Sequence, residues 1–153
     1  MNMILRPARE ADYVRIEAIW QQVHTLHVSL RPDAYAPRDP ALPPERFQEL
    51  LASETLLVAD VDGYVSGILV FSSRRVFSVS KGSRSILFID VMAVDESRRG
   101  QGLGRQMLAC IRDHAAAQGF DGVELQVAAG NTAARAMYEH CGFREKSVNM
   151  ELA

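Results

Sequence analysis

The chain has 153 residues, enough for one domain with a buried core, and we expect residues 1–153 to form a single domain. Apolar residues make up 48% and charged residues 24%, and the net charge of −2 argues against a general affinity for nucleic acid or anionic membranes. No apolar run approaches the ~18 residues that span a bilayer, and the first residues lack the apolar core of a secretory leader, so we expect a cytoplasmic protein.

The first half of the chain predicts a strand, two helices and a hairpin. Five of the six prolines lie between Pro32 and Pro44, which excludes regular structure there. Asp62-Gly63 between two apolar runs is a hairpin-turn signal. The predicted elements are a strand at 3–6, a helix capped by Asp12 and running to about His24, a helix at 44–51, and strands at 56–59 and 65–71.

The second half predicts alternating strands and helices. Residues 72–85 are polar and basic, which favours a mobile connection or a frayed strand end. Residues 86–94 are apolar except for Asp90 and predict a central buried strand. The remaining predicted elements are a helix from about Gly102 to Gly119, a strand at 123–127, a helix from Asn131 or Thr132 to Gly142, and a terminal strand at 143–152. The order β-α-α-β-β-β-α-β-α-β is typical of a mixed α/β sandwich with helices on both faces.

The clearest motif is the run Arg98-Arg99-Gly100-Gln101-Gly102-Leu103-Gly104-Arg105, which lies between the buried strand and the next helix. Glycines let the backbone approach a ligand closely and adopt conformations that other residues resist. A helix N-terminus offers unpaired N–H groups and a partial positive charge. The run therefore predicts a site for an anion such as a pyrophosphate.

Three phosphate-binding patterns compete for this run. A Walker P-loop is absent, and the dinucleotide fingerprint fails because Arg105 stands where its third glycine belongs. The pattern Arg/Gln-x-x-Gly-x-Gly/Ala is met by Arg99, Gly102 and Gly104. The plainer alternative is that the glycines only make a tight strand-to-helix turn.

With this pattern, the chain resembles the GCN5-related N-acetyltransferase (GNAT) superfamily. The stretches that carry the resemblance are the strand end 92–94, the loop 99–104 and the late segment 131–143. The resemblance is specific over about residues 86–145 and follows the element order of the whole chain. It implies a mixed, mostly antiparallel central sheet with helices on both faces, and an enzyme that uses acetyl-CoA as co-substrate.

The resemblance also implies roles for single residues. Backbone groups at the strand end would bind the pantetheine arm, the loop would bind the pyrophosphate, and Asn131 would contact the arm. The implied cofactor-binding residues are Met92, Ala93, Val94, Arg99, Gly100, Gln101, Gly102, Leu103, Gly104, Arg105 and Asn131. Tyr138, which shares a helix face with Asn131, would stand near the thioester sulfur as a catalytic proton donor. Its alternative role is to anchor the helix by packing.

The general base is less defined by the sequence. Some relatives place a glutamate where this chain has Gln126, which cannot take a proton. Others place an acid at the position of Asp90, the only charge in its apolar run. A buried carboxylate is costly unless it is paired or functional, so Asp90 is either the catalytic base or a structural acceptor.

The expected reaction is acetyl transfer from acetyl-CoA to a primary amine of a small molecule or peptide, by direct attack in a ternary complex. The proline-rich segment is the expected wall of the acceptor site, although its residues also suit a solvated loop; they are His24, His27, Arg31, Asp33 and Tyr35. The alternatives are a non-catalytic acyl-CoA-binding regulatory module and a nucleotide-binding protein.

Two further expectations concern metals and assembly. The histidines and cysteines lack zinc-site spacing, so we expect no metal site. The short terminal strand would leave an open sheet edge, so we expect a homodimer.

Overall fold

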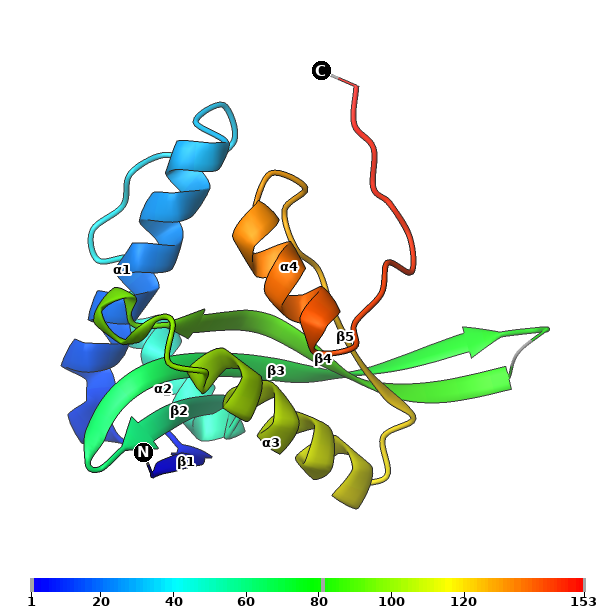
Figure 1. Cartoon of the computed structure of the whole chain (residues 1–153), viewed down its shortest axis with the longest axis horizontal. Coiled ribbons are helices and arrows are strands. Elements are labelled where there is room, and N and C mark those ends of the chain that lie inside the picture. Colours follow the sequence, from blue (N-terminus) through cyan, green and yellow to red (C-terminus); the bar gives the residue numbers. More distant parts are fainter. Residues whose placement is uncertain (1, 81, 153) are drawn as a thin grey trace.

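The computed structural model describes residues 2–80 and 82–152, and its centre is a five-stranded sheet (Figure 1). The strands, in spatial order, are β1 (Met3–Pro7), β2 (Leu56–Val61), β3 (Tyr64–Ser78), β4 (Gly82–Val94) and β5 (Gly122–Leu125). The pairs β1–β2, β2–β3 and β3–β4 are antiparallel, and β4–β5 is parallel. The predicted mixed, mostly antiparallel sheet is therefore confirmed.

Four helices cover the two faces of the sheet. They are α1 (Tyr13–Leu30), α2 (Pro44–Ser53), α3 (Leu103–Ala117) and α4 (Thr132–His140), with 3-10 turns η1 (Glu10–Asp12) and η2 (Glu96–Arg98). Ile16 of α1 and Phe47 of α2 belong to one hydrophobic core, and Met107 of α3 belongs to a second core on the other face. Tyr138 of α4 packs against that second core. Within the described ranges, no helix is long and apolar enough to span a membrane.

The first helix is longer than predicted. It continues past His24 to Leu30, because the first residue that cannot continue a helix is Pro32. The predicted hairpin at Asp62-Gly63 is confirmed, and both residues have positive φ, 52° and 88°. These are the angles that a tight two-residue turn between antiparallel strands requires.

For residues 72–85 the sequence left a mobile connection or a frayed strand end open, and the mobile connection is wrong. Residues 72–78 and 82–85 extend β3 and β4 into a two-stranded arm, paired as far as Ser78 and Gly82, which projects to the right in Figure 1. This part of the ladder lies beyond the core, so its side chains need not be buried. Its sequence therefore lacks the apolar alternation by which a strand is predicted. The exposed tip includes Phe77, 74% accessible.

The predicted terminal strand is also wrong. Residues 144–152 form no helix or strand, and all of them are exposed. The preceding strand is shorter than predicted: β5 ends at Leu125, so Gln126 lies in the connection to α4. The fold therefore has one strand fewer than the sequence suggested.

Candidate active site

A gap opens between β4 and β5 beyond their short ladder. The parallel pairing runs from Ile86 with Gly122 to Ile89 with Leu125 and stops there. Met92–Val94 continue past it and pair only with β3 among the described residues. The other edge of this strand end therefore leaves backbone groups of Met92 and Ala93 available to a ligand, whereas the carbonyl of Val94 already accepts Nε of Arg99 at 3.1 Å.

The glycine-rich run lies directly after this strand end and begins α3. Gly100 and Gly102 have φ of 78° and 81°, which side-chain-bearing residues rarely adopt. Gly102 is the N-cap of α3, and its carbonyl accepts the amide of Gln106 at 3.1 Å. The amides of Leu103, Gly104 and Arg105 come before that bond, so they lack helical partners. The first turn carries no acidic side chain, so this N-terminus is suited to an anion.

Gly104 is the point where the three predicted parts of the site meet. A side-chain carbon at Gly104 would lie 3.5 Å from Cε of Met137 in α4 and 3.8 Å from Cε of Met92 in β4. The glycine-rich run, the strand end and the last helix are therefore in contact, although they are separated in sequence.

Tyr138 lies on α4 beside this junction. Its ring is half-buried in the second core, 5.7 Å from the ring of Phe143. Burial raises the pKa of Tyr138, so its hydroxyl stays protonated at neutral pH. Asn131, at the N-cap of α4, accepts the amide of Ala134 with its Oδ1 at 3.2 Å.

Asp90 lies on a β-bulge and is not buried, contrary to the sequence prediction. Val91 pairs with Val70, and Ile89 pairs with Phe71, so Asp90 has no partner on β3. Its side chain is 34% accessible, with Oδ1 4.0 Å from Arg74.

The bulge also changes which side chains share a face of β4. Leu87, Ile89, Met92 and Val94 all pack on the second core. Arg74, which lies over the ring of Phe88, also reaches Asp90, so Asp90 shares the face of Phe88 and not that of Leu87 and Ile89. The prediction that it shares a face with Met92 and Val94 is therefore wrong.

A buried network that the sequence did not predict holds residues 95–96, just before the glycine-rich run. Asp95, the first residue after β4, is only 4% exposed and forms an ion pair with Arg15 of α1. Gln22 of α1 donates to Asp95 Oδ1 at 3.1 Å and accepts the amide of Glu96 at 2.9 Å. Burial alone would raise the pKa of Asp95, but the hydrogen bonds from Gln22 and Arg15 outweigh it, and the pKa is lowered. A carboxylate directly after an apolar strand was the available signal.

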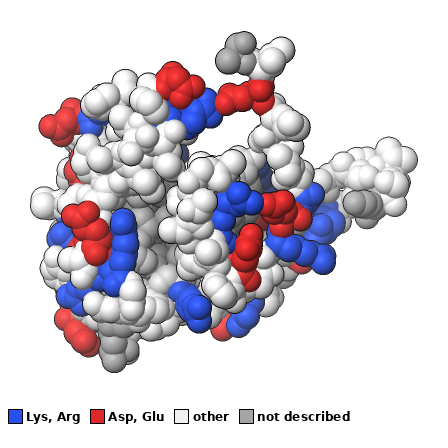
Figure 2. Space-filling view, turned by 45° about the horizontal axis from the view of Figure 1, so that its top comes forward, with Lys and Arg blue, Asp and Glu red and all other residues white. Residues whose placement is uncertain are grey.

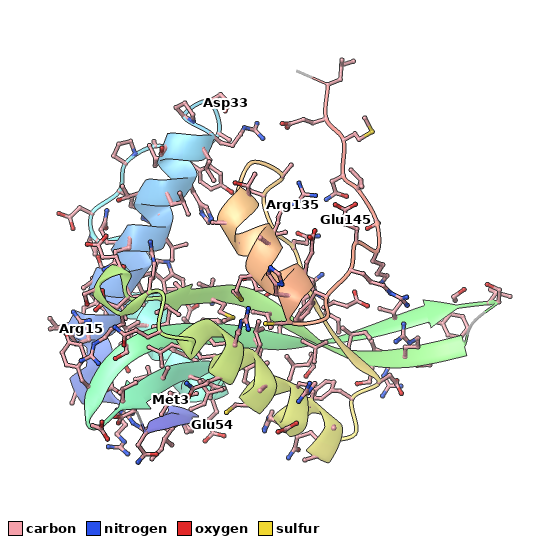
Figure 3. The ribbon with its side chains drawn as sticks, viewed as in Figure 1. Met3, Arg15, Asp33, Glu54, Arg135 and Glu145 are labelled. Atoms are coloured by element: carbon pink, nitrogen blue, oxygen red, sulfur yellow. The ribbon has the colours of Figure 1, made fainter. Side chains whose placement is uncertain are left out.

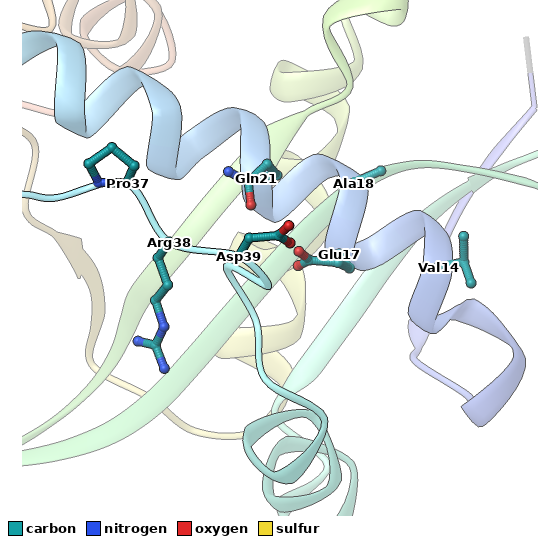
Figure 4. Close-up of a pocket in the computed structure, with 7 residues that line it drawn as sticks. All are labelled: Val14, Glu17, Ala18, Gln21, Pro37, Arg38 and Asp39. Atoms are coloured by element: carbon teal, nitrogen blue, oxygen red, sulfur yellow. The ribbon is translucent and has the colours of Figure 1, made fainter.

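Two hollows lie along α1. One of about 290 Å³ separates α1 from η2, and Gln22, Glu96 and the predicted Arg99 line it. The larger, of about 610 Å³, lies between α1 and the proline-rich segment, where Figure 4 shows Glu17 and Asp39 facing each other. Gln21 lines both hollows; its Oε1 is buried, with no hydrogen-bond partner among the described residues.

The predicted acceptor residues gather at the end of α1. The ring of Tyr35 lies 6.4 Å from that of His24 and 5.1 Å from that of His27, and Arg31 pairs with Asp33. They contact each other and line neither hollow.

The visible face of the described surface carries charges of both signs. Figure 2 shows Lys and Arg side chains mixed with Asp and Glu there. In the described ranges no cluster of His, Cys, Asp and Glu is arranged to hold a metal ion.

Comparison with known proteins gives a consistent result. Residues 20–143 match the acetyltransferase (GNAT) family. A mycothiol acetyltransferase of Clavibacter michiganensis subsp. michiganensis is 35% identical over 96 residues, 63% of this chain and 28% of that protein. One from Beutenbergia cavernae is 43% identical over 63 residues, 41% of this chain and 21% of that protein. The matches thus span less than a third of these relatives.

Solved structures match over the whole chain. The tetramutant of BH1408 protein from Bacillus halodurans is 30% identical, with a TM-score of 0.92 over 98% of this chain and 99% of that chain. The aminoglycoside N-acetyltransferase AAC(6')-Iy, solved in complex with CoA, has a TM-score of 0.68 at 18% identity, covering 99% of this chain and 94% of that chain. The second likeness shows a common fold. Because the family match spans most of the sequence, this chain belongs to the acetyltransferase (GNAT) family.

Proposed function

We propose that the protein transfers an acetyl group from acetyl-CoA to a primary amine, by direct attack in a ternary complex. The observation that carries this proposal is the contact at Gly104, which joins an anion-binding helix start, an open strand edge and the helix of Tyr138. The first two features suit a ligand with a phosphate end and an amide-rich arm. The third supplies a proton donor.

Each part of the co-substrate has a proposed partner. The amides from Gly100 to Arg105, with the guanidinium of Arg99, bind the pyrophosphate. The open edge of Met92–Val94 pairs with the amides of the pantetheine arm as a further strand would. Because Oδ1 of Asn131 already caps α4, its amide nitrogen is the group that contacts the arm.

The reaction needs no nucleophile from the protein. The amine lone pair attacks the thioester carbonyl carbon, and backbone N–H groups of β4 beside the gap between β4 and β5 stabilise the oxyanion. The C–S bond then breaks, and the hydroxyl of Tyr138 gives its proton to the thiolate. Holding both reactants together supplies much of the remaining rate.

Asp90 remains our proposed base. Its exposed carboxylate can take the proton of the amine directly or through water, which its position on a bulge beside the end of the β4–β5 ladder permits. The pair with Arg74 is loose at 4.0 Å and leaves the carboxylate accessible. Water is the alternative proton acceptor.

The acceptor is proposed to bind against α1 and to be a small molecule or peptide that carries a primary amine. Glu17, Gln21 and Asp39 line the larger hollow. Both carboxylate oxygens of Glu17 already accept the backbone amides of Ala41 and Leu42, so Asp39 is the acid that we propose to meet an ammonium or hydroxyl donor. His24, His27 and Tyr35 cluster near the end of α1 and line neither hollow, so we do not include them in the proposed acceptor site.

A CoA-release assay over a panel of amines tests this function. The panel should include amino sugars, polyamines, amino acids and peptides, since relatives and fold neighbours are named for mycothiol and aminoglycoside substrates. Turnover that needs both substrates supports the enzyme. Tight binding of acetyl-CoA by calorimetry with no turnover over the panel would favour a regulatory acyl-CoA-binding module, and ATP competing with acetyl-CoA would favour a nucleotide-binding protein.

We also propose that the chain acts as a homodimer. The outer edge of β5 has no strand partner in the described part of the chain. An open edge of this kind readily pairs with a second chain.

A further inference from the structure

A cation and an acid lie close together on the sheet, at the point where β4 and β5 part. Arg74 of β3 has its guanidinium carbon 3.4 Å from the ring centroid of Phe88, and one of its nitrogens lies 4.0 Å from Oδ1 of Asp90. Asp90 directly follows the last pair of the β4–β5 ladder, which joins Ile89 to Leu125. Arg74 and Asp90, which we call the loose pair, therefore lie beside the gap in which we place the reaction.

The ring of Phe88 sets the orientation of the guanidinium. Phe88 is only 7% exposed, so it offers a fixed surface, and the face of an aromatic ring attracts a cation. At 3.4 Å the guanidinium lies flat on the ring, which leaves the N–H donors at its edge free to bind. Its one ion pair within the described residues, to Asp90, is longer than a hydrogen bond. Arg74 thus presents its donors in a set direction beside a carboxylate that it does not fully engage.

The charges at the neighbouring end of β5 are already matched. Nζ of Lys146 lies 3.0 Å from each carboxylate oxygen of Glu124 on β5. Figure 3 shows Arg135 of α4 beside Glu145, and these two residues form an ion pair. By contrast, the loose pair is open to solvent, with side chains 50% and 34% accessible. The loose pair therefore keeps hydrogen-bonding capacity for a ligand that carries both signs of charge.

We propose that the acceptor is a free α-amino acid, whose carboxylate binds Arg74 and whose ammonium binds Asp90. The two charged groups of an α-amino acid are attached to the same carbon, and charge-assisted hydrogen bonds are about 2.8 Å long, so both bonds can form across the 4.0 Å gap. A lysine side chain or a peptide N-terminus has no carboxylate beside its amine and leaves the guanidinium unbound. The inference rests on the proposed acetyl transfer with Asp90 as base, and it narrows the class of acceptor.

An amino acid bound in this way has its amine ready for transfer. Asp90 takes one proton of the ammonium and passes it to solvent. The nitrogen then forms the new C–N bond as the thioester C–S bond breaks, and the second proton that it loses replaces the one that Tyr138 gives to the thiolate. The products are an N-acetylamino acid, CoA and a proton. Arg74 gives and takes no proton, so its removal should affect only substrates that carry the carboxylate.

CoA release from the common amino acids and from their α-carboxamides tests the site. For each pair we compare kcat/KM of the acid with that of the amide, which has nearly the same shape but no negative charge. In Arg74→Gln this ratio should fall on the order of 10–10²-fold, as expected when a charge-assisted hydrogen bond is lost, while the amides react as in the wild type. Arg74→Lys should recover part of the ratio. The amine of an amide is less basic than that of an acid, but this difference is the same in every variant and cancels when the ratios are compared.

Arg75→Gln is the matched control. Arg75 is the next residue of β3, so its side chain points to the opposite face, where it donates to Oγ of Ser83 at 3.0 Å. Its ratio of acid to amide should equal that of the wild type. Both arginines are exposed, so Arg74→Gln and Arg75→Gln should keep the unfolding temperature and the Kd for acetyl-CoA of the wild type.

The remaining outcomes separate this inference from the proposed function. Turnover of other amines without any amino acid, or an unchanged ratio in Arg74→Gln, would overturn the inference and leave acetyl transfer in place. An equal loss of activity toward acids and amides would give Arg74 a structural role and would also overturn it. Binding of acetyl-CoA without turnover of any amine would overturn the proposed function, and the inference with it.

Discussion

Replacing Gly102 by aspartate tests the phosphate site with a change in charge alone, provided that asparagine serves as the reference. Gly102 has φ of 81° and caps α3, and a side-chain carbon there would meet nothing within 4 Å. Aspartate and asparagine have the same shape, tolerate this backbone region and cap helices about equally well. Both variants should therefore fold, with similar unfolding temperatures in the absence of ligand.

The expected loss of affinity follows from Coulomb's law. A carboxylate about 4 Å from a phosphate charge is disfavoured by about 4 kcal/mol at an effective dielectric constant of about 20. Each 1.4 kcal/mol changes Kd about tenfold, and salt screens part of the effect. Gly102→Asp should therefore bind acetyl-CoA on the order of 10²–10³-fold more weakly than Gly102→Asn.

Isothermal calorimetry against acetyl-CoA at fixed ionic strength measures the difference. A ratio of dissociation constants below about five would refute the reasoning, because a charge of the same sign beside the phosphates cannot be that cheap. Equal and complete loss of binding in both variants would show that shape at Gly102 decides binding, and it would also count against the phosphate site at the helix start.

Three further predictions concern the chemistry and the buried network. Tyr138→Phe should lower kcat on the order of 10²-fold with little change in the Kd for acetyl-CoA, while Tyr64→Phe, the matched control, changes neither; an unchanged kcat in Tyr138→Phe would assign that residue to packing. Asp90→Asn should keep acetyl-CoA binding, lose most activity at neutral pH and recover in part at higher pH, where more of the amine is neutral; wild-type activity across the pH range would remove Asp90 from the mechanism. The native pKa of Asp95 lies below its ordinary 3.8, so the stability that its contacts contribute is present above that value and is lost as pH falls through the native pKa. The urea midpoints of wild type and Asp95→Asn should therefore differ at neutral pH and converge in acid. A difference that persists in acid would contradict this.

The glycine-rich run was predictable because its signal is local. Positive φ at Gly100 and Gly102 and the N-terminus of α3 depend on neighbouring residues only, and the sequence displays them directly. The same holds for the cap at Asn131. Features set by one turn of chain can be predicted from one stretch of sequence.

The errors concern features that depend on distant partners. The bulge at Asp90 is fixed by the register between β3 and β4, so alternation along β4 alone placed its side chain on the wrong face. The network at Asp95 joins it to Arg15 and Gln22, 80 and 73 residues earlier in the chain. The terminal strand predicted at 143–152 is wrong for the same reason, since a strand needs a pairing partner and the described chain provides none for these residues.

The ladder between β4 and β5 has a consequence for the order in which the molecule opens. It joins only four residue pairs, fewer than any other ladder among the described strands, and the chain between its two strands passes through α3. Local unfolding is favoured where few hydrogen bonds must break, so we expect β5 and α4 to separate from β4 before the other strands part. Tyr138 belongs to this part, while Gly102 and Met92 lie on the other side of the β4–β5 ladder. A ligand that contacts both sides of the β4–β5 ladder should therefore hold β5 and α4 in place. Proteases should then cleave residues 126–131 sooner in the free protein than in the liganded protein.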